Sequence, residues 1–209
     1  MQKHQQDVFQ SWAKFLNPAS LKLNLIIASL FLAAYETLRN SIIEQIRAFF
    51  TNGFNQEGCI VDPKYQRDVL SRHKSPLRAS LLWFREMHVV DDSDIELVDR
   101  IREHRNQLAH DLPKFIATND ADINVELIGS IYQLVTRIDR WWVREVEIPT
   151  NPDFDDQDVA AIPDAGITSG NMMFLQLMIQ IATGDDADAE EMYSQFMQVV
   201  EKHAVQTSA

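Results

Sequence analysis

Apolar residues recur every three or four positions along most of the chain, which is the spacing of helices that pack one face into a core. Residues 20–50 are apolar on all sides in their first half, as in a helix at the middle of a bundle or against a second subunit. No internal repeat and no hairpin dipeptide between alternating strands is present. The pattern predicts an all-α protein, an up-and-down bundle of about five to six helices with an appended C-terminal helical pair.

Prolines and capping residues predict where these helices begin and end. The signals are Asn17-Pro18, Asn52-Gly53, Asp62-Pro63, Ser75-Pro76, and a capping box formed by Ser93 with Glu96. Because Pro113 favours an extended conformation for Leu112, the helix that follows the capping box must end close to His110. We expect helices at residues 5–16, 20–50, 93–110, 121–146, 171–183 and 188–203, with two shorter helices starting at 63 and 76.

The chain divides into three segments by composition. Residues 1–147 form the predicted bundle, and residues 171–209 form the acidic helical pair. Between them, residues 148–170 contain three prolines and no periodicity, and the segment is longer than ordinary connections inside a compact domain. We interpret it as a linker or lid.

Charge is distributed unevenly along the chain, whose net charge is −12. Residues 1–144 hold 18 acidic and 18 basic side chains, whereas residues 145–209 hold 13 acidic side chains and the single Lys202. The first 144 residues are therefore neutral and compatible with a nucleic-acid partner, which the total charge alone would disfavour. Within them the segment 64–86 has a basic surplus, and the residues considered for RNA binding are Arg67, Arg72, Lys74 and Arg78. The alternative is a set of solvated helix faces.

Several classes of protein are disfavoured by composition. A single cysteine, Cys59, excludes an internal disulfide and offers no thiolate cluster for a structural metal. The longest apolar run, residues 25–35, is about half of what a bilayer crossing needs, and the N-terminal residues lack the pattern of a signal peptide. The acidic stretch Asp153 to Asp158 lacks the glycine and glutamate of a calcium loop. We therefore expect a cytoplasmic protein without a cofactor, a metal site or a membrane partner.

The stretch HRNQLAHDLP, residues 104–113, concentrates ionisable side chains at the end of a predicted helix. The last carbonyls of a helix favour a charged imidazole, so His110 is placed to exchange protons near neutral pH. Arg105 can bind two oxygens of a phosphodiester at once. The two residues are five positions apart, about 140° around a helix, so they cannot be a local pair while the helix persists. We expect the unwinding at the helix end to let the His110 ring turn toward Arg105, particularly through Asn106 or another chain.

The run Arg105-Asn106-Gln107-Leu108-Ala109-His110 resembles the signature of the HEPN superfamily: arginine, a polar residue, a short spacer and histidine, within a helical bundle. The resemblance covers roughly residues 5–147. It implies a metal-independent endoribonuclease of toxin–antitoxin, abortive-infection or phage-defence systems, working as a homodimer with both motifs in one cleft. His110 would be the acid and base, Arg105 the phosphate ligand, and Asn106 the residue that orients them. Glu36 matches the acidic residue that members often carry on an earlier helix, and His104 would have a supporting role.

Other interpretations stay open at this stage. Arg67 and His73 form a second, looser copy of the motif, and Arg105 and His110 could simply form helix-end ion pairs. The protein could be a catalytically inactive member of the same fold that dimerises or binds a nucleotide or a partner. The acidic segment could imitate RNA and cover a basic cleft. The resemblance also implies an antitoxin or regulatory protein as a partner. Members silenced by tyrosine modification carry a tyrosine where this chain has Leu112, so a nucleotidyltransferase antitoxin acting at that position is not expected.

Overall fold

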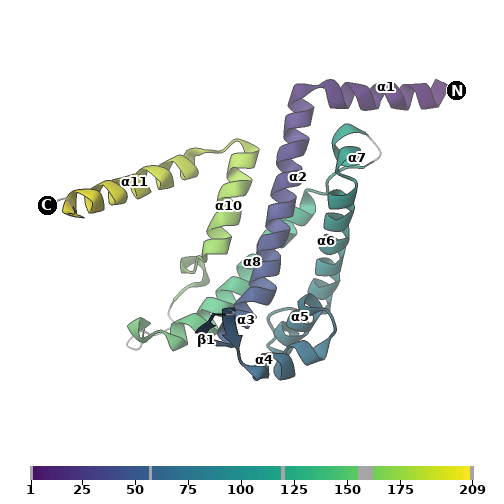
Figure 1. Cartoon of the computed structure of the whole chain (residues 1–209). Coiled ribbons are helices and arrows are strands. Elements are labelled where there is room, and N and C mark those ends of the chain that lie inside the picture. Colours follow the sequence, from purple (N-terminus) through teal and green to yellow (C-terminus); the bar gives the residue numbers. More distant parts are fainter. Residues whose placement is uncertain (1, 57, 119–120, 155–161, 208–209) are drawn as a thin grey trace.

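The computed structural model describes residues 2–56, 58–118, 121–154 and 162–207, and it is predominantly helical, which confirms the all-α prediction (Figure 1). The α-helices are α1 (Gln2–Leu16), α2 (Pro18–Arg39), α3 (Gln45–Phe49), α4 (Pro63–Asp68), α5 (Pro76–Glu86), α6 (Asp92–His110), α7 (Leu112–Ala117), α8 (Glu126–Trp142), α9 (Ile148–Thr150), α10 (Gly170–Thr183) and α11 (Ala187–Thr207).

Helix α2 forms the centre of the bundle, where α6, α8 and α10 pack around it (Figure 1). A π-helical segment, Asn40–Glu44, joins α2 to α3, so that Pro18–Phe49 is one continuous helix. By length and composition alone this helix could cross a membrane. In the fold it supplies the core, because Phe31, Leu38, Ile42 and Ile46 are almost completely buried.

The helices α2 and α6 start earlier than predicted. Asn17 caps α2 by accepting hydrogen bonds from the backbone N–H groups of Ala19 and Ser20, so α2 begins at Pro18 and not at residue 20. The capping box of α6 is formed by Asp91 and Asp94, two residues before the predicted pair. The Asp91 carboxylate accepts from the Asp94 N–H at 3.0 Å, and Asp94 accepts from the Asp91 N–H at 2.9 Å. Aspartate is as effective as serine at the N-cap position, and Asp91 precedes the predicted cap Ser93 in the chain, so the helix starts earlier.

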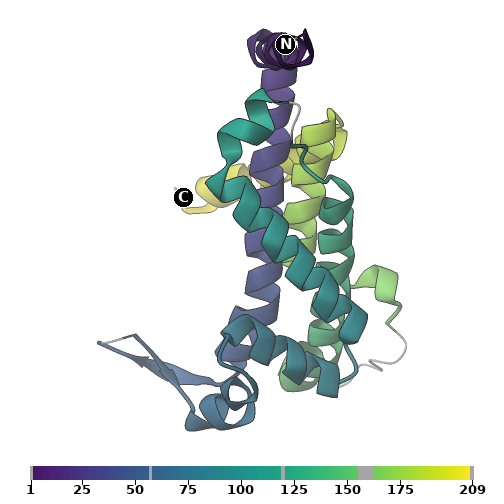
Figure 2. The same cartoon turned by 90° about the vertical axis from the view of Figure 1, so that its right-hand side faces the viewer.

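A small antiparallel hairpin, β1 (Thr51–Asn55) and β2 (Gly58–Val61), was not predicted; Figure 2 shows it pointing away from the bundle. Gly53 and Gly58 have φ values of 154° and 121°, which favour glycine. The strands are short and largely exposed, so they leave no alternation of apolar and polar residues in the sequence.

The connection from α6 to α8 also differs from the prediction. Helix α6 ends at His110 as expected, but Leu112 begins α7 immediately instead of being extended. Asp111 makes the break instead, with φ −119° and ψ 28°, and Pro113 is tolerated in the first turn of the new helix. Helix α8 starts at Glu126, five residues later than predicted, where the Asn124 side chain accepts from the Glu126 N–H at 3.1 Å.

The helix α10 packs into the same core as the bundle, with Met172 and Leu175 buried against α2 and α8. Its N-terminus is fixed by Asp139 of α8, a completely buried carboxylate that accepts from Gln45 at 3.0 Å and from the Ser169 hydroxyl at 2.5 Å. Ser169 in turn caps α10 by accepting from the Met172 N–H. This network holds α3, α8 and α10 together.

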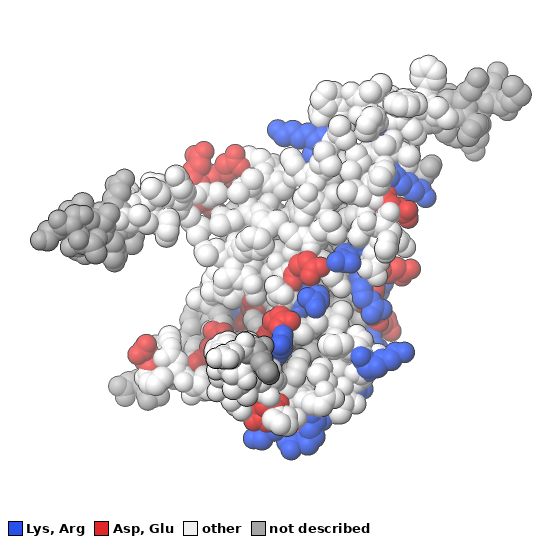
Figure 3. Space-filling model, viewed as in Figure 1, with Lys and Arg blue, Asp and Glu red and all other residues white. Residues whose placement is uncertain are grey.

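The helices α1 and α11 extend from opposite sides of the bundle (Figure 1). The described parts of these helices carry large apolar side chains that are exposed: Val8, Phe9, Trp12, Phe15, Leu16, Met192, Tyr193, Phe196 and Val200. Charged side chains gather instead over the lower bundle on the face shown in Figure 3. The single chain therefore leaves apolar surface uncovered on both arms.

Candidate functional site

Helix α6 positions the predicted motif because its opposite face is anchored in the core. Ile95, Val98, Ile101 and Leu108 are buried, whereas the side chains of the motif lie on the remaining surface. The Asp111 N–H still donates to the Gln107 carbonyl at 2.8 Å, so the helix persists through His110. The expectation that unwinding turns the His110 ring toward Arg105 is therefore wrong for the single chain, because the two residues keep their helical separation of about 140°.

Arg105 points toward α2, where it meets the acidic residue expected on an earlier helix. Its Nη2 atom lies 3.0 Å from Oε1 of Glu36, and its guanidinium stands 5.2 Å from the centre of the Tyr35 ring. The Nη1 atom donates to the side-chain oxygen of Asn106 at 3.3 Å. The structure thus brings Arg105, Asn106 and Glu36 together; the contribution of Tyr35 was not predicted.

His110 lies on another part of the same helix. Its side chain is exposed and lines a shallow groove of about 640 Å³ together with Asn106, which is one turn away. No hydrogen bond or ion pair between described residues joins His110 to Arg105. All side chains that line the groove come from α6 and the Asp111 that ends it: Asp99, Arg100, Arg102, Glu103, Asn106, Gln107, His110 and Asp111.

This arrangement places a guanidinium and an imidazole on either side of one amide. Asn106 contacts Arg105 directly and shares the groove with His110, so it lies between the two groups. The carboxylate of Glu36 holds Arg105 in place and neutralises part of its charge. A phosphodiester that reached from the groove toward α2 would lie beside the His110 imidazole and then the Arg105 guanidinium.

His104 has a structural environment. Its ring lies between Phe31 and Phe115, with ring centres 4.9 and 5.7 Å away, and its Nε2 atom accepts a hydrogen bond from the Asn124 N–H at 3.1 Å. Burial lowers the pKa of His104 below its usual value, because the charged form loses hydration. A neutral His104 therefore holds the segment before α8 against the end of α6.

The basic segment considered for RNA binding is largely neutralised in the fold. Arg67 binds both oxygens of Asp68 at 2.6 and 2.8 Å, Arg72 binds both oxygens of Glu86, and Arg78 lies 2.7 Å from Asp99. Lys74 is exposed. The competing motif copy is occupied as well, since His73 accepts from the Ser75 N–H through Nδ1.

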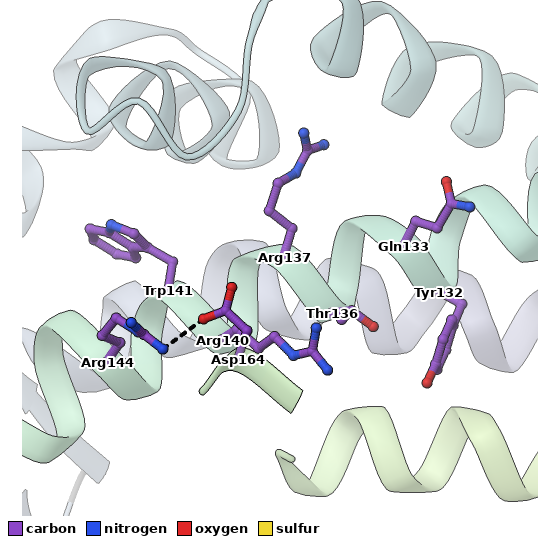
Figure 4. A pocket seen from close by; sticks show the side chains of 8 residues that line it. All are labelled: Tyr132, Gln133, Thr136, Arg137, Arg140, Trp141, Arg144 and Asp164. Carbon is purple, nitrogen blue, oxygen red and sulfur yellow. Dashed lines mark hydrogen bonds and ion pairs between the residues drawn. The ribbon is translucent and has the colours of Figure 1, made fainter. Parts of the chain in front are cut away.

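A group of polar, charged and aromatic side chains that was not predicted lines a groove of about 540 Å³ along α8 and the π-helical turn Val143–Glu147 that follows it (Figure 4). Its members are Tyr132, Gln133, Thr136, Arg137, Arg140, Trp141, Arg144 and Asp164. Spacings of three and four residues between the arginines were the available signal, because they place all three on one side of a helix. In the sequence such spacing is equally typical of a solvated face.

Among the described residues, no three His, Cys, Asp or Glu side chains are grouped so that they could hold a metal ion. Most of the acidic stretch compared with a calcium loop, Asp155 to Asp158, lies outside the described residues.

Comparisons with known proteins leave the interpretation to this geometry. No family model matches the chain, and searches of curated proteins and of solved structures also give no match.

Proposed function

We propose that the protein is a metal-independent endoribonuclease of the HEPN type. The observation that carries this proposal is the 3.0 Å ion pair between Arg105 and Glu36, residues 69 positions apart on α6 and α2. Arg105 is the arginine of the motif, and Glu36 matches the acidic residue that members of the family often carry on an earlier helix. Asn106 and His110, the other motif residues, are accessible in one groove next to that pair.

The proposed reaction uses the RNA as its own nucleophile. A 2′-hydroxyl attacks the adjacent phosphorus and loses its proton to an imidazole, while the departing 5′-oxygen gains a proton from a second acid. Arg105 stabilises the additional negative charge on the phosphoryl oxygens. The products are a 2′,3′-cyclic phosphate and a 5′-hydroxyl. One His110 cannot take and give a proton in the same step, so two copies of the motif would share the work.

A homodimer would supply the second copy. The groove that holds His110 is lined by one helix and its end residue, so one wall of a closed cleft is missing in the single chain. The helix α1 extends past α7, on the side of the molecule where α6 ends, and exposes Phe9 and Trp12 (Figure 1). Exposed aromatic surface of this kind is typical of protein contacts. Light scattering of the wild type beside Trp12→Glu tests the dimer: a mass of one chain for both would exclude it.

The nuclease proposal is tested with purified full-length protein and a single-stranded RNA in EDTA. We expect cleavage with a 2′,3′-cyclic phosphate end and a loss of at least about 100-fold in His110→Ala, the contribution typical of a general acid or base. His73→Ala is the matched control, because it removes the histidine of the competing copy and should leave the rate unchanged. Undiminished cleavage by His110→Ala would remove this site from the reaction.

A second candidate is a catalytically inactive member of the fold that dimerises or binds a nucleotide or a protein partner. The observation that favours it is the engagement of Arg105, which already holds a carboxylate and an aromatic ring. Expression in bacteria separates the two, because an active nuclease in a toxin or defence role should slow growth and degrade RNA, whereas His110→Ala should not. If neither form affects growth or RNA integrity, and purified protein leaves RNA intact, the second candidate is favoured.

A further inference from the structure

The groove along α8 has two parallel walls. Figure 4 shows Gln133, Arg137 and Trp141 in one row along the helix and Tyr132, Thr136 and Arg140 in the neighbouring row. Each wall repeats every four residues, so neighbouring side chains stand one above the next along the helix. The groove of about 540 Å³ is within the range of small-molecule sites. Unlike the groove on α6, it includes a residue of a distant segment, Asp164.

The cations of this groove differ in what they bind. Arg137 lies 2.5 Å from the buried Asp94, and Arg144 lies 2.6 Å from Asp164. Arg140 is paired with no carboxylate of the described residues; its Nε atom donates to the Ile167 carbonyl at 3.3 Å. The guanidinium of Arg140 is thus half-buried, fixed at Nε, and not neutralised. It is the best-prepared anion ligand on α8.

A second observation also points to a missing polar ligand. The hydroxyl oxygen of Thr136 is buried and has no hydrogen-bond partner among the described residues. It stands one turn from Arg140 on the same wall of the groove (Figure 4). A buried hydroxyl without a partner is costly, so a ligand that hydrogen-bonds to Thr136 would recover free energy.

The residues at the two ends of the groove define the shape of that ligand. Arg140 and Arg144 are toward one end, and Tyr132 and Gln133 are at the other, with Tyr132 and Arg140 about 12 Å apart along the helix axis. The Tyr132 ring offers a flat surface, and the Gln133 amide offers one acceptor and two donors to the edge of a heterocycle. We propose that this groove binds a mononucleotide, with its phosphate between Arg140 and Arg144, its sugar beside Thr136 and its base against Tyr132 and Gln133.

The segment after residue 161 occupies the phosphate end in the present structure. Asp164 and the Ile162 carbonyl both accept from Arg144, and the Ile167 carbonyl accepts from Arg140. An acidic side chain and two carbonyls therefore take places that phosphate oxygens would take. Binding of the nucleotide would have to displace Asp164 from Arg144, so this carboxylate should weaken binding.

Calorimetric titration of the full chain with AMP, inorganic phosphate and adenosine tests the proposal. We expect AMP to bind more tightly than either part alone, because only AMP reaches both ends of the groove. Arg140→Gln should weaken AMP binding at least about tenfold, since a charge-assisted hydrogen bond is lost. Thr136→Val should weaken it several-fold, and Asp164→Asn should strengthen it. Arg47→Gln on α3 removes an equal charge elsewhere and should change nothing.

The opposite signs expected for Arg140→Gln and Asp164→Asn separate a site from general damage to the fold, which would weaken binding in both. Thermal unfolding of each variant checks that the fold is retained. AMP that binds no better than phosphate would overturn the nucleotide site, and so would equal affinity of Arg140→Gln and Arg47→Gln. Neither result would affect the nuclease proposal, which concerns α6.

Discussion

The α6 face and the α8 face both present arginines above a packed core, but they differ in how helical spacing distributes them. On α6 the arginine and the histidine are five residues apart, so Arg105 turns to α2 and His110 turns to an open groove. On α8 and the π-helical turn after it, Arg137, Arg140 and Arg144 are three and four residues apart and line one groove. Side chains of one helix line the same groove when their spacing matches the helix period. The motif residues of α6 are therefore divided between α2 and a groove, whereas these arginines share one groove.

The largest effect that sharpens this comparison is expected from Arg105→Ala. Loss of the cation that we propose stabilises the phosphoryl oxygens should lower the RNA cleavage rate by roughly 100- to 1,000-fold, the cost of removing one such donor. The change also removes the Arg105 partner of Glu36, whose other carboxylate oxygen lies 3.8 Å from Arg39, so Glu36→Gln is the matched control for the ion pair. A rate that falls equally in both variants would indicate that the pair, rather than the cation, is what matters. An unchanged rate in Arg105→Ala would contradict the proposed role.

The second effect concerns the buried side of α8. Asp139→Ala removes the carboxylate that binds Gln45 and Ser169, leaving two donors without an acceptor. We expect the free energy of unfolding to fall by about 2–3 kcal/mol in urea titrations. Asp139→Asn keeps an acceptor and should cost less. Equal losses in the two variants would mean that charge, and not hydrogen bonding, dominates at this position.

A smaller effect is expected for the pH dependence of stability, through His104 of α6. Because burial lowers the folded-state pKa of His104, the unfolded chain binds a proton more readily as pH falls below about 6.5. The stabilisation that His104 gives to the fold is thus fully present above pH 7 and is lost on acidification. Because the group is partly exposed, this loss should lower the free energy of unfolding by less than about 1 kcal/mol. Urea unfolding at pH 7.5 and 5.5 should show a smaller pH difference in His104→Gln than in the wild type. The same pH dependence in both proteins would exclude this residue as the cause.

The smallest effect is expected for RNA cleavage by Arg140→Gln. A large effect would contradict the separation of the α6 and α8 grooves. Arg140→Gln should leave RNA cleavage within about twofold of the wild type, since a remote surface charge contributes little once salt screens it. The measurement is the cleavage rate at physiological salt. A loss comparable to that of Arg105→Ala would show that the α8 groove belongs to the RNA site.

Most helices were predictable because their local signals agree with their packing. Pro63 and Pro76 begin α4 and α5, and Gly184 ends α10 with φ 83°. The ion pair of Glu36 with Arg105 was anticipated only through the family resemblance, since nothing in the spacing of residues on two helices specifies their approach. The direction of His110 was mispredicted because the effect of Pro113 falls on Asp111 and not on the histidine.

Features that depend on distant parts of the chain left no readable signal. Asp139 looks like a surface charge in an amphipathic helix, yet it is buried because α3 and the cap of α10 supply its donors. The arginines of α8 and of the turn after it line a groove because the distant segment around Asp164 packs against one end of them. Tertiary partners of this kind are not encoded by local periodicity.

Because α6 is continuous through His110, the number of residues between Arg105 and His110 sets the angle between their side chains around the helix. Each residue inserted between Arg105 and Leu108 would rotate everything after it by about 100° and advance it by about 1.5 Å. Because Leu108 is buried, such an insertion would pull an apolar side chain out of the core before it realigned the histidine. The buried leucine thus locks the register of the motif.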